Sequence, residues 1–396
     1  MQKVASFFLS LSLIKGLSVL LQLAMILTVN LSMSQSSSGV FLWLYSLFFV
    51  LSAFSRAGQD LLILRVDGNS DKTSFSIVII NSLLFSLLSF LIAYAYTADW
   101  VLSLYVGLAL TLNSVIVHRA HFLQSIGQYY LQVISNNFLT NLFFSFSVLF
   151  ILYTDIVADA ILLYVCCQLI SIAVVSVFNK STYVLNELSY DVKLIVEARY
   201  FCALNVTSFL INWFPPILIG VLLGDGIVSI VVILLRFGMV ASFPLVVVNS
   251  FFAGKLRAIK GGIAESFGFF KVVNTLTFII SFIAVMVMTL GVDALFNILS
   301  IDTMYKNMFY LIITASFISS LTGPVALYLN MLGEDKTVFI FSCISFIAMV
   351  LVISILSGEL PNLSVGIAIL LQSTLSNIPL YIILIRKYKL EKATLS

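Results

Sequence analysis

Four charged side chains stand inside long apolar runs of this sequence: Lys15, Arg56, Asp60 and Arg236. A charge in such a run is costly in lipid, so it normally faces a polar interior or a partner. Arginine also has a planar fork of donors that can grip two phosphate oxygens at once. These residues are therefore the first candidates for a binding site, and an anion is the ligand that three of them would favour.

Arg56 and Asp60 are spaced i, i+4, so they share one face of a helix and can form an ion pair. One interpretation is a self-contained structural pair. The other is a cavity arginine that binds substrate while Asp60 moderates its charge. Asp60 is also a candidate proton or sodium site, and spacing alone leaves these interpretations open.

Arg236 lies about ten residues from the outer end of its apolar run, or roughly 15 Å of helical rise. That depth is the middle of a bilayer, where the side chain reaches neither surface easily. We expect a cation that lines a water-filled cavity, and the alternative is a structural partner for a neighbouring helix. Lys15 is nearer the inner surface, where its long stem could carry the ammonium to the interface.

Amide and hydroxyl side chains repeat at helical spacing in several runs. Lys15 shares a face with Ser18 and Gln22, which favours a polar wall over simple snorkelling to the interface. Each stripe alone could equally bond one helix to another, but several together favour a hydrated cavity. The amides assigned to this cavity are Gln22, Asn137, Asn141, Asn205 and Asn212.

His118, Arg119 and His121 lie together near the inner end of another apolar run. No cysteine or carboxylate is close in sequence, so a metal site is not expected. A cationic cytoplasmic mouth that meets phosphate is the preferred interpretation, and an interfacial anchor is the alternative. The sequence also lacks a phosphate-binding glycine loop and the usual hydrolase motifs, so we expect no cofactor and no enzymatic activity.

The elements that position these residues follow from composition. Only 9% of the residues are charged and 61% are hydrophobic, whereas a soluble domain is about 25% charged. Apolar runs of about 20 residues recur, each long enough to cross a bilayer as a helix. We therefore predict an all-α polytopic membrane protein with about twelve spans: 7–30, 39–64, 75–97, 100–122, 130–154, 158–178, 200–223, 227–250, 271–292, 307–330, 337–357 and 364–385.

Orientation follows from lysine and arginine, which cytoplasmic loops retain. With the N-terminus inside, sixteen of the twenty basic residues fall on the cytoplasmic side, and Lys306 is the one found outside. We expect a multi-pass protein of the bacterial inner membrane with both termini in the cytoplasm. The net charge of +3 then reflects topology and gives no support to nucleic-acid binding.

The chain divides into two predicted lobes of six helices, 1–178 and 200–396, joined by an amphipathic cytoplasmic linker at 179–199. The stretches Leu123–Gln128 and Leu329–Glu334 are similar, and each leaves the fourth span of its half. Two halves that both start inside would be parallel repeats.

Three stretches carry a family resemblance: Lys15-Gly16, the run from Gly39 through Arg56-Ala57-Gly58 to Arg65, and Asn330–Glu334. Through them the chain resembles the multidrug/oligosaccharidyl-lipid/polysaccharide exporter superfamily, and most of all its O-antigen (Wzx-type) flippases. The resemblance implies a V-shaped pair of six-helix lobes around a central cationic cavity that alternates between faces. It also places cavity arginines on the second and eighth helices, at positions similar to Arg56 and Arg236.

The function implied is translocation of a polyprenyl-diphosphate-linked oligosaccharide from the cytoplasmic to the periplasmic leaflet, with Arg236, Arg56 and Lys15 on the diphosphate. Membrane lipid, a polysaccharide polymerase and chain-length proteins are the expected partners. One rival is a cation-coupled drug antiporter of the same superfamily. Such exporters are expected to carry a carboxylate in the first helix, where this chain has Lys15. The other rival is an O-antigen polymerase or ligase, which generally needs a larger outer loop than the sequence offers.

Overall fold

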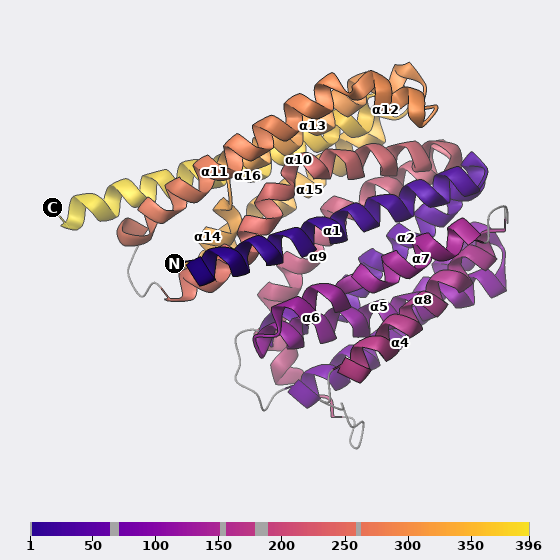
Figure 1. Cartoon of the computed structure of the whole chain (residues 1–396), viewed down its shortest axis with the longest axis horizontal. Coiled ribbons are helices and arrows are strands. Elements are labelled where there is room, and N and C mark those ends of the chain that lie inside the picture. Colours follow the sequence, from indigo (N-terminus) through magenta and orange to yellow (C-terminus); the bar gives the residue numbers. More distant parts are fainter. Residues whose placement is uncertain (1, 64–70, 151–155, 179–188, 259–262, 396) are drawn as a thin grey trace. The chain divides into compact units, whose positions relative to one another are not determined.

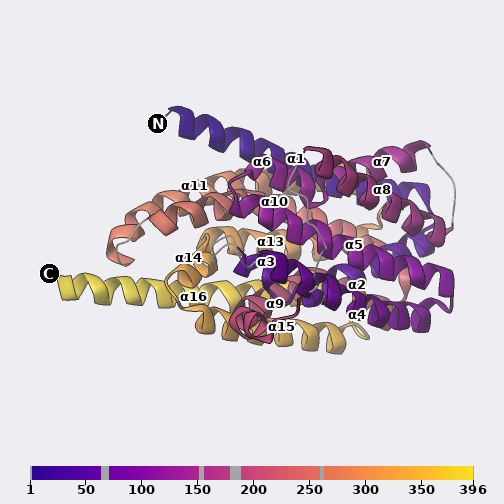
Figure 2. The same cartoon turned by 90° about the horizontal axis from the view of Figure 1, so that it is seen from below.

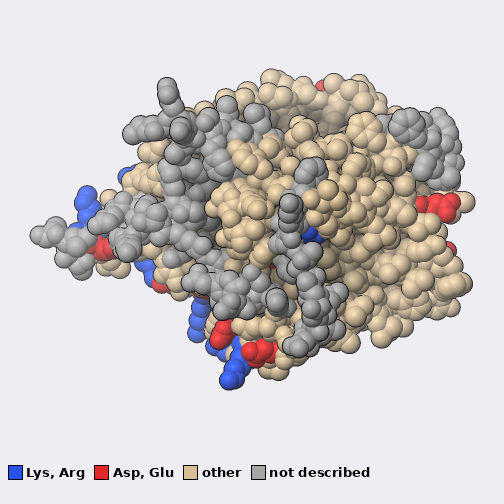
Figure 3. Space-filling view, turned by 60° about the horizontal axis from the view of Figure 1, so that its bottom comes forward, with Lys and Arg blue, Asp and Glu red and all other residues tan. Residues whose placement is uncertain are grey.

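The computed structural model describes residues 2–63, 71–150, 156–178, 189–258 and 263–395. Within these ranges every regular element is helical, and ten helices are long and apolar enough to cross a membrane. On the face in Figure 3, most of the acidic and basic side chains lie toward its left, lower left and right edges, and the other described residues, in tan, separate these edges. The all-α membrane fold predicted from composition is confirmed.

The chain forms two compact units, Met1–Val232 and Ile233–Ser396. Within unit 1, α2 packs on α4, α5 and α9, and α5 packs on α4 and α8. Figure 1 shows α4, α5, α7 and α8 running alongside one another. The elements of unit 1 are α1 (Gln2–Ser32), α2 (Gln35–Ser55), α3 (Gln59–Leu62), α4 (Asp71–Thr97), α5 (Trp100–Ser125), α6 (Tyr129–Val133), the π-helix η1 (Ile134–Phe138), α7 (Leu139–Phe150), α8 (Val157–Phe178), α9 (Val192–Leu223) and the start of α10 (Asp225–Ala258).

Unit 2 is built around α16, which packs on α11, α13, α14 and α15. The long helices α15 and α16 run side by side (Figure 2). The elements of unit 2 are the rest of α10, α11 (Ile263–Leu290), α12 (Val292–Ile298), the 3-10 turn η2 (Thr303–Tyr305), α13 (Lys306–Thr322), α14 (Val325–Met331), α15 (Asp335–Leu356) and α16 (Ser364–Leu395).

Short polar side chains fix where several helices begin. Asp99 accepts hydrogen bonds from the backbone N–H groups of Val101 and Leu102 at 2.9 and 3.0 Å, and so caps α5. Asp191 caps α9 in the same way, at 2.8 Å from the Lys193 N–H. Such caps satisfy donors that have no partner within the helix. α9 therefore begins at Val192, before the predicted start at residue 200.

The predicted span 130–154 is interrupted. Asn137 has φ of +63°, which ends regular α-helix and produces the π-helical turn η1 between α6 and α7. Asparagine tolerates this left-handed conformation better than most residues. The predicted span 307–330 is also broken, at Gly323 (φ +68°) and Pro324, into α13 and α14. Hydropathy gave the extent of these segments and missed both breaks.

The linker predicted at 179–199 is described only in its second part. Residues 179–188 lie outside the described residues, and from Val192 the chain is already α9. The two similar stretches Leu123–Gln128 and Leu329–Glu334 form the same turn. In each, the last N–H donates to the first carbonyl, at 2.8 and 3.0 Å, and the glycine, Gly127 or Gly333, has φ near +80°. This Schellman turn ends a helix in each half and supports the predicted repeat.

Candidate functional site

The Arg56–Asp60 pair lies at a break in the chain. α2 ends at Ser55, Ala57 and Gly58 have φ of +47° and +75°, and α3 begins at Gln59. Across this turn the Arg56 Nε donates to Asp60 Oδ2 at 2.9 Å, with both side chains buried. The ion pair expected from the i, i+4 spacing is therefore present. The continuous helix 39–64 that was expected to carry it is wrong, because two left-handed residues end α2.

Gly58 brings this turn against α9. A β-carbon at Gly58 would lie 2.5 Å from the Cys202 backbone N and 2.7 Å from the Ala198 carbonyl oxygen. Only glycine fits so close to another backbone. The contact places α9 beside Asp60, whose Oδ2 accepts a second hydrogen bond from Asn205 Nδ2 at 3.0 Å. One predicted amide and one predicted carboxylate therefore meet directly.

The remaining donors of Arg56 face α2 and α9. Its Nη1 donates to Ser52 Oγ at 3.0 Å, and Asn113 Nδ2 of α5 donates to the same oxygen at 2.8 Å. The guanidinium carbon lies 5.0 Å from the centre of the Phe209 ring, within cation–π range. Its Nη2 is buried and has no hydrogen-bond acceptor among the described residues. This nitrogen is therefore the donor of Arg56 that could bind a ligand.

The basic group on α5 is more buried than a cytoplasmic mouth would suggest. His118 is 0% exposed, stacks on Phe75 at 5.9 Å between ring centres, and has no hydrogen bond to either ring nitrogen within the described residues. Asp60 interacts electrostatically with both His118 and His121. Arg119 is directed elsewhere, since its Nη1 donates to Ser176 of α8 at 2.6 Å.

Two further groups of predicted site residues lie apart from Asp60 in the interactions described. Lys15 and Gln22 are half-buried on α1. Asn137 and Asn141 are buried at the η1 kink and on α7, and their side-chain oxygens have no donor among the described residues. Asn212 is exposed on α9, and its Nδ2 donates to its own helix at Ser208, so it does not join Asn205 at Asp60.

Arg236 is a buried cation of unit 2. It lies eleven positions into α10 from Asp225, or about 17 Å of helical rise, and is 6% exposed. Its Nη1 donates to the sulfur of Met239 at 2.8 Å, a weak acceptor one turn away. Close packing holds the next turn, because a β-carbon at Gly238 would lie 2.3 Å from Ile312 of α13.

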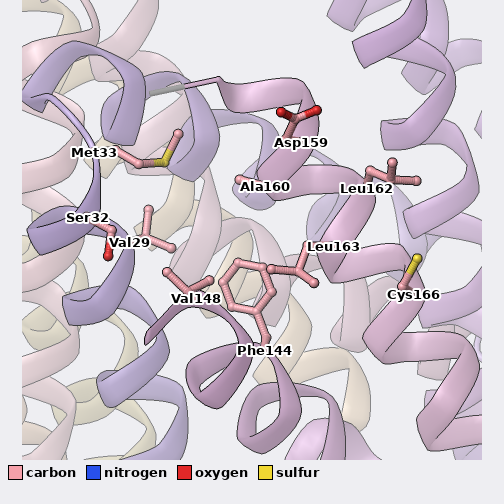
Figure 4. A pocket seen from close by; sticks show the side chains of 10 residues that line it. All are labelled: Val29, Ser32, Met33, Phe144, Val148, Asp159, Ala160, Leu162, Leu163 and Cys166. Carbon is pink, nitrogen blue, oxygen red and sulfur yellow. The ribbon is translucent and has the colours of Figure 1, made fainter. Parts of the chain in front are cut away.

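Two pockets in unit 1 have a chemistry unsuited to a diphosphate. One, of about 330 Å³, lies between α1, α7 and α8 and has a mostly apolar lining, with Ser32 and Asp159 as its polar members (Figure 4). The second, of about 600 Å³, contains the carboxylates Asp99 and Asp225, and Tyr96 donates to Asp225. Residues of the first are Val29, Ser32, Met33, Phe144, Val148, Asp159, Ala160, Leu162, Leu163 and Cys166.

The sequence interpretation missed the neutral residues around Arg56. Ser52 contacts Arg56, and Asn113 contacts Ser52. One signal was available, because Ser52, Arg56 and Asp60 repeat at intervals of four. Nothing in the sequence pointed to Asn113, whose role depends on the packing of α5 on α2.

Comparisons with known proteins agree on the fold. No family model matches the chain, and no curated protein matches it. Among solved structures, the MATE multidrug transporter DinF-BH superposes with a TM-score of 0.72 at 15% identity, covering 96% of this chain and 95% of that one. An inward-facing multidrug resistance MATE family transporter of the MOP superfamily gives 0.67 at 14% identity over 96% of both chains. An outward-facing one gives 0.60 at 14% identity over 98% and 96%.

The chain therefore is a multi-pass membrane protein with the fold of the MATE transporters. That fold has twelve helices in two lobes, which confirms the predicted fold class. Ten are the long helices already counted within the described residues, and the interrupted segments at α6–α7 and α13–α14 supply the other two.

Proposed function

We propose that this protein is a flippase that moves a polyprenyl-diphosphate-linked oligosaccharide, such as an O-antigen repeat unit, from the cytoplasmic to the periplasmic leaflet. One observation carries the proposal: arginines are buried in both units, Arg56 and Arg119 in unit 1 and Arg236 in unit 2, within a helical membrane fold otherwise poor in charge. Buried ionisable residues in membrane helices normally mark the path of a substrate or an ion. A phosphate group is a ligand that an arginine suits.

The chemistry of the ligand requires such groups. Two phosphates and many hydroxyls cannot cross hydrocarbon without polar partners. The planar guanidinium of arginine binds phosphate oxygens in pairs, and the Nη2 of Arg56 has a hydrogen to give. Lys15 adds a third cation, and the amide side chains on α1, η1, α7 and α9 supply donors and acceptors for sugar.

Membrane potential can supply the driving force. A charge moved through the full potential is worth about 2.3 kcal/mol per 100 mV. A negative cell interior would therefore push two phosphate charges outward by about 4 to 5 kcal/mol per 100 mV, and a cationic site returning empty would offset part of this. The fold neighbours include inward-facing and outward-facing transporters, which supports alternating access as the mechanism.

A drug antiporter is the second candidate, because the fold neighbours are multidrug transporters by name. The first helix argues against it. Residues Gln2–Ser32 contain no aspartate or glutamate, whereas Lys15 would repel a cationic drug. An O-antigen polymerase or ligase is less favoured, because the neighbours of this fold are transporters. We place the protein in a bacterial inner membrane with both termini in the cytoplasm, next to a polysaccharide polymerase and chain-length proteins.

The test is Arg236→Ala in a cell that displays surface glycan. We expect loss of surface glycan and accumulation of the lipid-linked unit in the cytoplasmic leaflet, at an unchanged level of folded protein. Arg236→Met keeps the apolar stem and should fail equally, whereas Arg236→Lys keeps charge without the fork and should retain part of the activity.

Arg386→Ala is the matched control, since Arg386 is exposed on α16 of the same unit. It should export normally. The measurement is leaflet-resolved lipid-linked oligosaccharide divided by folded protein. Full export by a well-folded Arg236→Ala variant would refute the proposal, and a fall in export that only follows a fall in protein level would assign Arg236 a structural role.

A further inference from the structure

The hydroxyl of Ser52 on α2 uses all of its hydrogen-bonding capacity. Its hydrogen is donated to the Phe49 carbonyl at 3.0 Å. Its oxygen accepts from Arg56 Nη1 at 3.0 Å and from Asn113 Nδ2 at 2.8 Å. Because a hydroxyl donates once and accepts twice, Ser52 has no further bond to make.

The Ser52 bonds fix which way round the Asn113 amide lies. If the amide oxygen faced Ser52 in place of Nδ2, two oxygens would meet with no hydrogen between them, since the Ser52 hydrogen is already donated. Asn113 therefore turns Nδ2 toward Ser52 and has Oδ1 left over. Asn113 is 0% exposed, and its Oδ1 has no hydrogen-bond donor among the described residues.

Arg56 has the complementary group left over. Its Nη2 is buried, has no acceptor in the described part of the chain, and belongs to the guanidinium whose Nη1 bonds to Ser52. One serine oxygen thus joins a side chain with a donor to spare and a side chain with an acceptor to spare. Buried polar groups nearly always have partners, so this pair calls for a ligand or a bound water.

The packing of α5 on α2 holds Asn113 in this position. The two helices are joined by the Ser52–Asn113 hydrogen bond and, at the neighbouring position of α5, by Ser55 Oγ and Ser114 Oγ, which lie 2.7 Å apart. Two polar contacts at adjacent residues of α5 set the register of the helix pair. The Asn113 oxygen therefore has a fixed place beside the site of Arg56.

A phosphate alone satisfies one atom of this pair. Its oxygens accept a hydrogen bond from Arg56 Nη2, but a phosphate diester has no hydrogen to give to Asn113 Oδ1. A ligand that satisfies both atoms carries an O–H or N–H close to its phosphate. In a sugar diphosphate the nearest such group is the substituent on carbon 2, beside the anomeric carbon that bears the phosphate.

We infer that Asn113 determines the specificity of the proposed transport. Its Oδ1 accepts a hydrogen bond from the hydroxyl or amide N–H on carbon 2 of the first sugar, while Arg56 Nη2 binds the adjoining phosphate. The inference rests on the proposed function, which gives Arg56 its diphosphate. It adds a requirement that charge alone does not impose, namely a hydrogen-bond donor next to the phosphate.

Calorimetry on the native protein tests this requirement with two probes, water-soluble citronellyl diphosphate glucose and its 2-deoxy-2-fluoro counterpart. Fluorine replaces the hydroxyl at similar size and cannot donate a hydrogen bond. We expect the fluoro probe to bind about 5- to 150-fold more weakly, because it leaves one buried acceptor unsatisfied. Equal affinity for the two probes overturns the role of Asn113 and leaves the flippase proposal standing. No binding of either probe removes the anion-binding role of Arg56, and the inference falls with it.

Two variants assign the preference to one side chain. Asn113→Leu removes the acceptor at similar size, so the two probes should bind this variant equally, whatever its overall affinity. Gln168→Leu is the matched control and should keep the preference. Gln168 on α8 is also a 0% exposed amide that bonds to α5, at 3.2 Å from the Ala109 carbonyl, and its oxygen has no donor within the described residues. A preference that persists in Asn113→Leu would overturn the inference, and the comparison on the native protein decides it should that variant fail to fold.

Discussion

Gly58→Ala should lower the free energy of unfolding of this protein for two reasons, each of which the structure shows separately. Gly58 has φ of +75°, and a left-handed conformation costs an L-residue about 1–2 kcal/mol. The new methyl would also lie 2.5 Å from the Cys202 backbone N, and overpacking typically costs about 1–3 kcal/mol more. The expected total is about 2–5 kcal/mol.

Gly127→Ala is the matched control. Gly127 has φ of +79°, and a β-carbon there would meet nothing within 4 Å. It should lose only the conformational part, about 1–2 kcal/mol. The difference of about 1–3 kcal/mol is therefore the cost of the close approach between the Gly58 turn and α9.

The assay is the fraction of detergent-solubilised protein that stays monomeric after heating, which gives an apparent melting temperature. For 150–250 residues, 1 kcal/mol is worth about 2–4 °C, and unit 1 spans Met1–Val232. Gly58→Ala should thus melt about 2–12 °C below Gly127→Ala. Equal melting temperatures for the two variants would refute the close packing of α9 on this turn, and with it the position of Asn205 beside Asp60.

Two further predictions concern the ion pair and the topology. In Arg56→Asp with Asp60→Arg, the charges balance but no arginine occupies position 56, so we expect a folded protein without export; recovered export would show that Arg56 only neutralises Asp60. Reporter fusions after Lys72 and Lys392 should read cytoplasmic, and those after Ser37 and Asp302 periplasmic, because basic residues are retained inside; a reversal at any of the four would contradict the twelve-span topology.

Several residues of the candidate site could be singled out from sequence, because buried charges are rare in membrane-spanning segments. Arg56, Asp60 and Arg236 stood out within apolar runs, and the pairing of Arg56 with Asp60 follows from a spacing of four. The backbone geometry around that pair could not be predicted from the sequence. Hydropathy is an average over a window, so it continued the helix through Ala57 and Gly58, where two left-handed residues end it.

The surroundings of the pair were beyond the sequence for a different reason. Asp60 meets Asn205 across 145 positions of chain, and Ser52 meets Asn113 across 61. Each contact requires two helices to pack at one register, which no local pattern encodes. His118 looked like part of a cationic mouth because it lies beside Arg119, yet packing directs the two side chains to different partners.

The sequence by itself determined that the chain is an integral membrane protein, that it is helical, and about how many times it crosses the bilayer. It also determined which few charged residues lie within the membrane-spanning segments. These properties follow from the solvent each residue prefers, and that preference adds up along the chain. Only the tertiary structure decided which charges meet, where helices break, and that His118 is enclosed. Those outcomes depend on the close packing of segments that are distant in sequence. At Gly58, for example, the absence of a side chain sets how closely this turn approaches the backbone of α9.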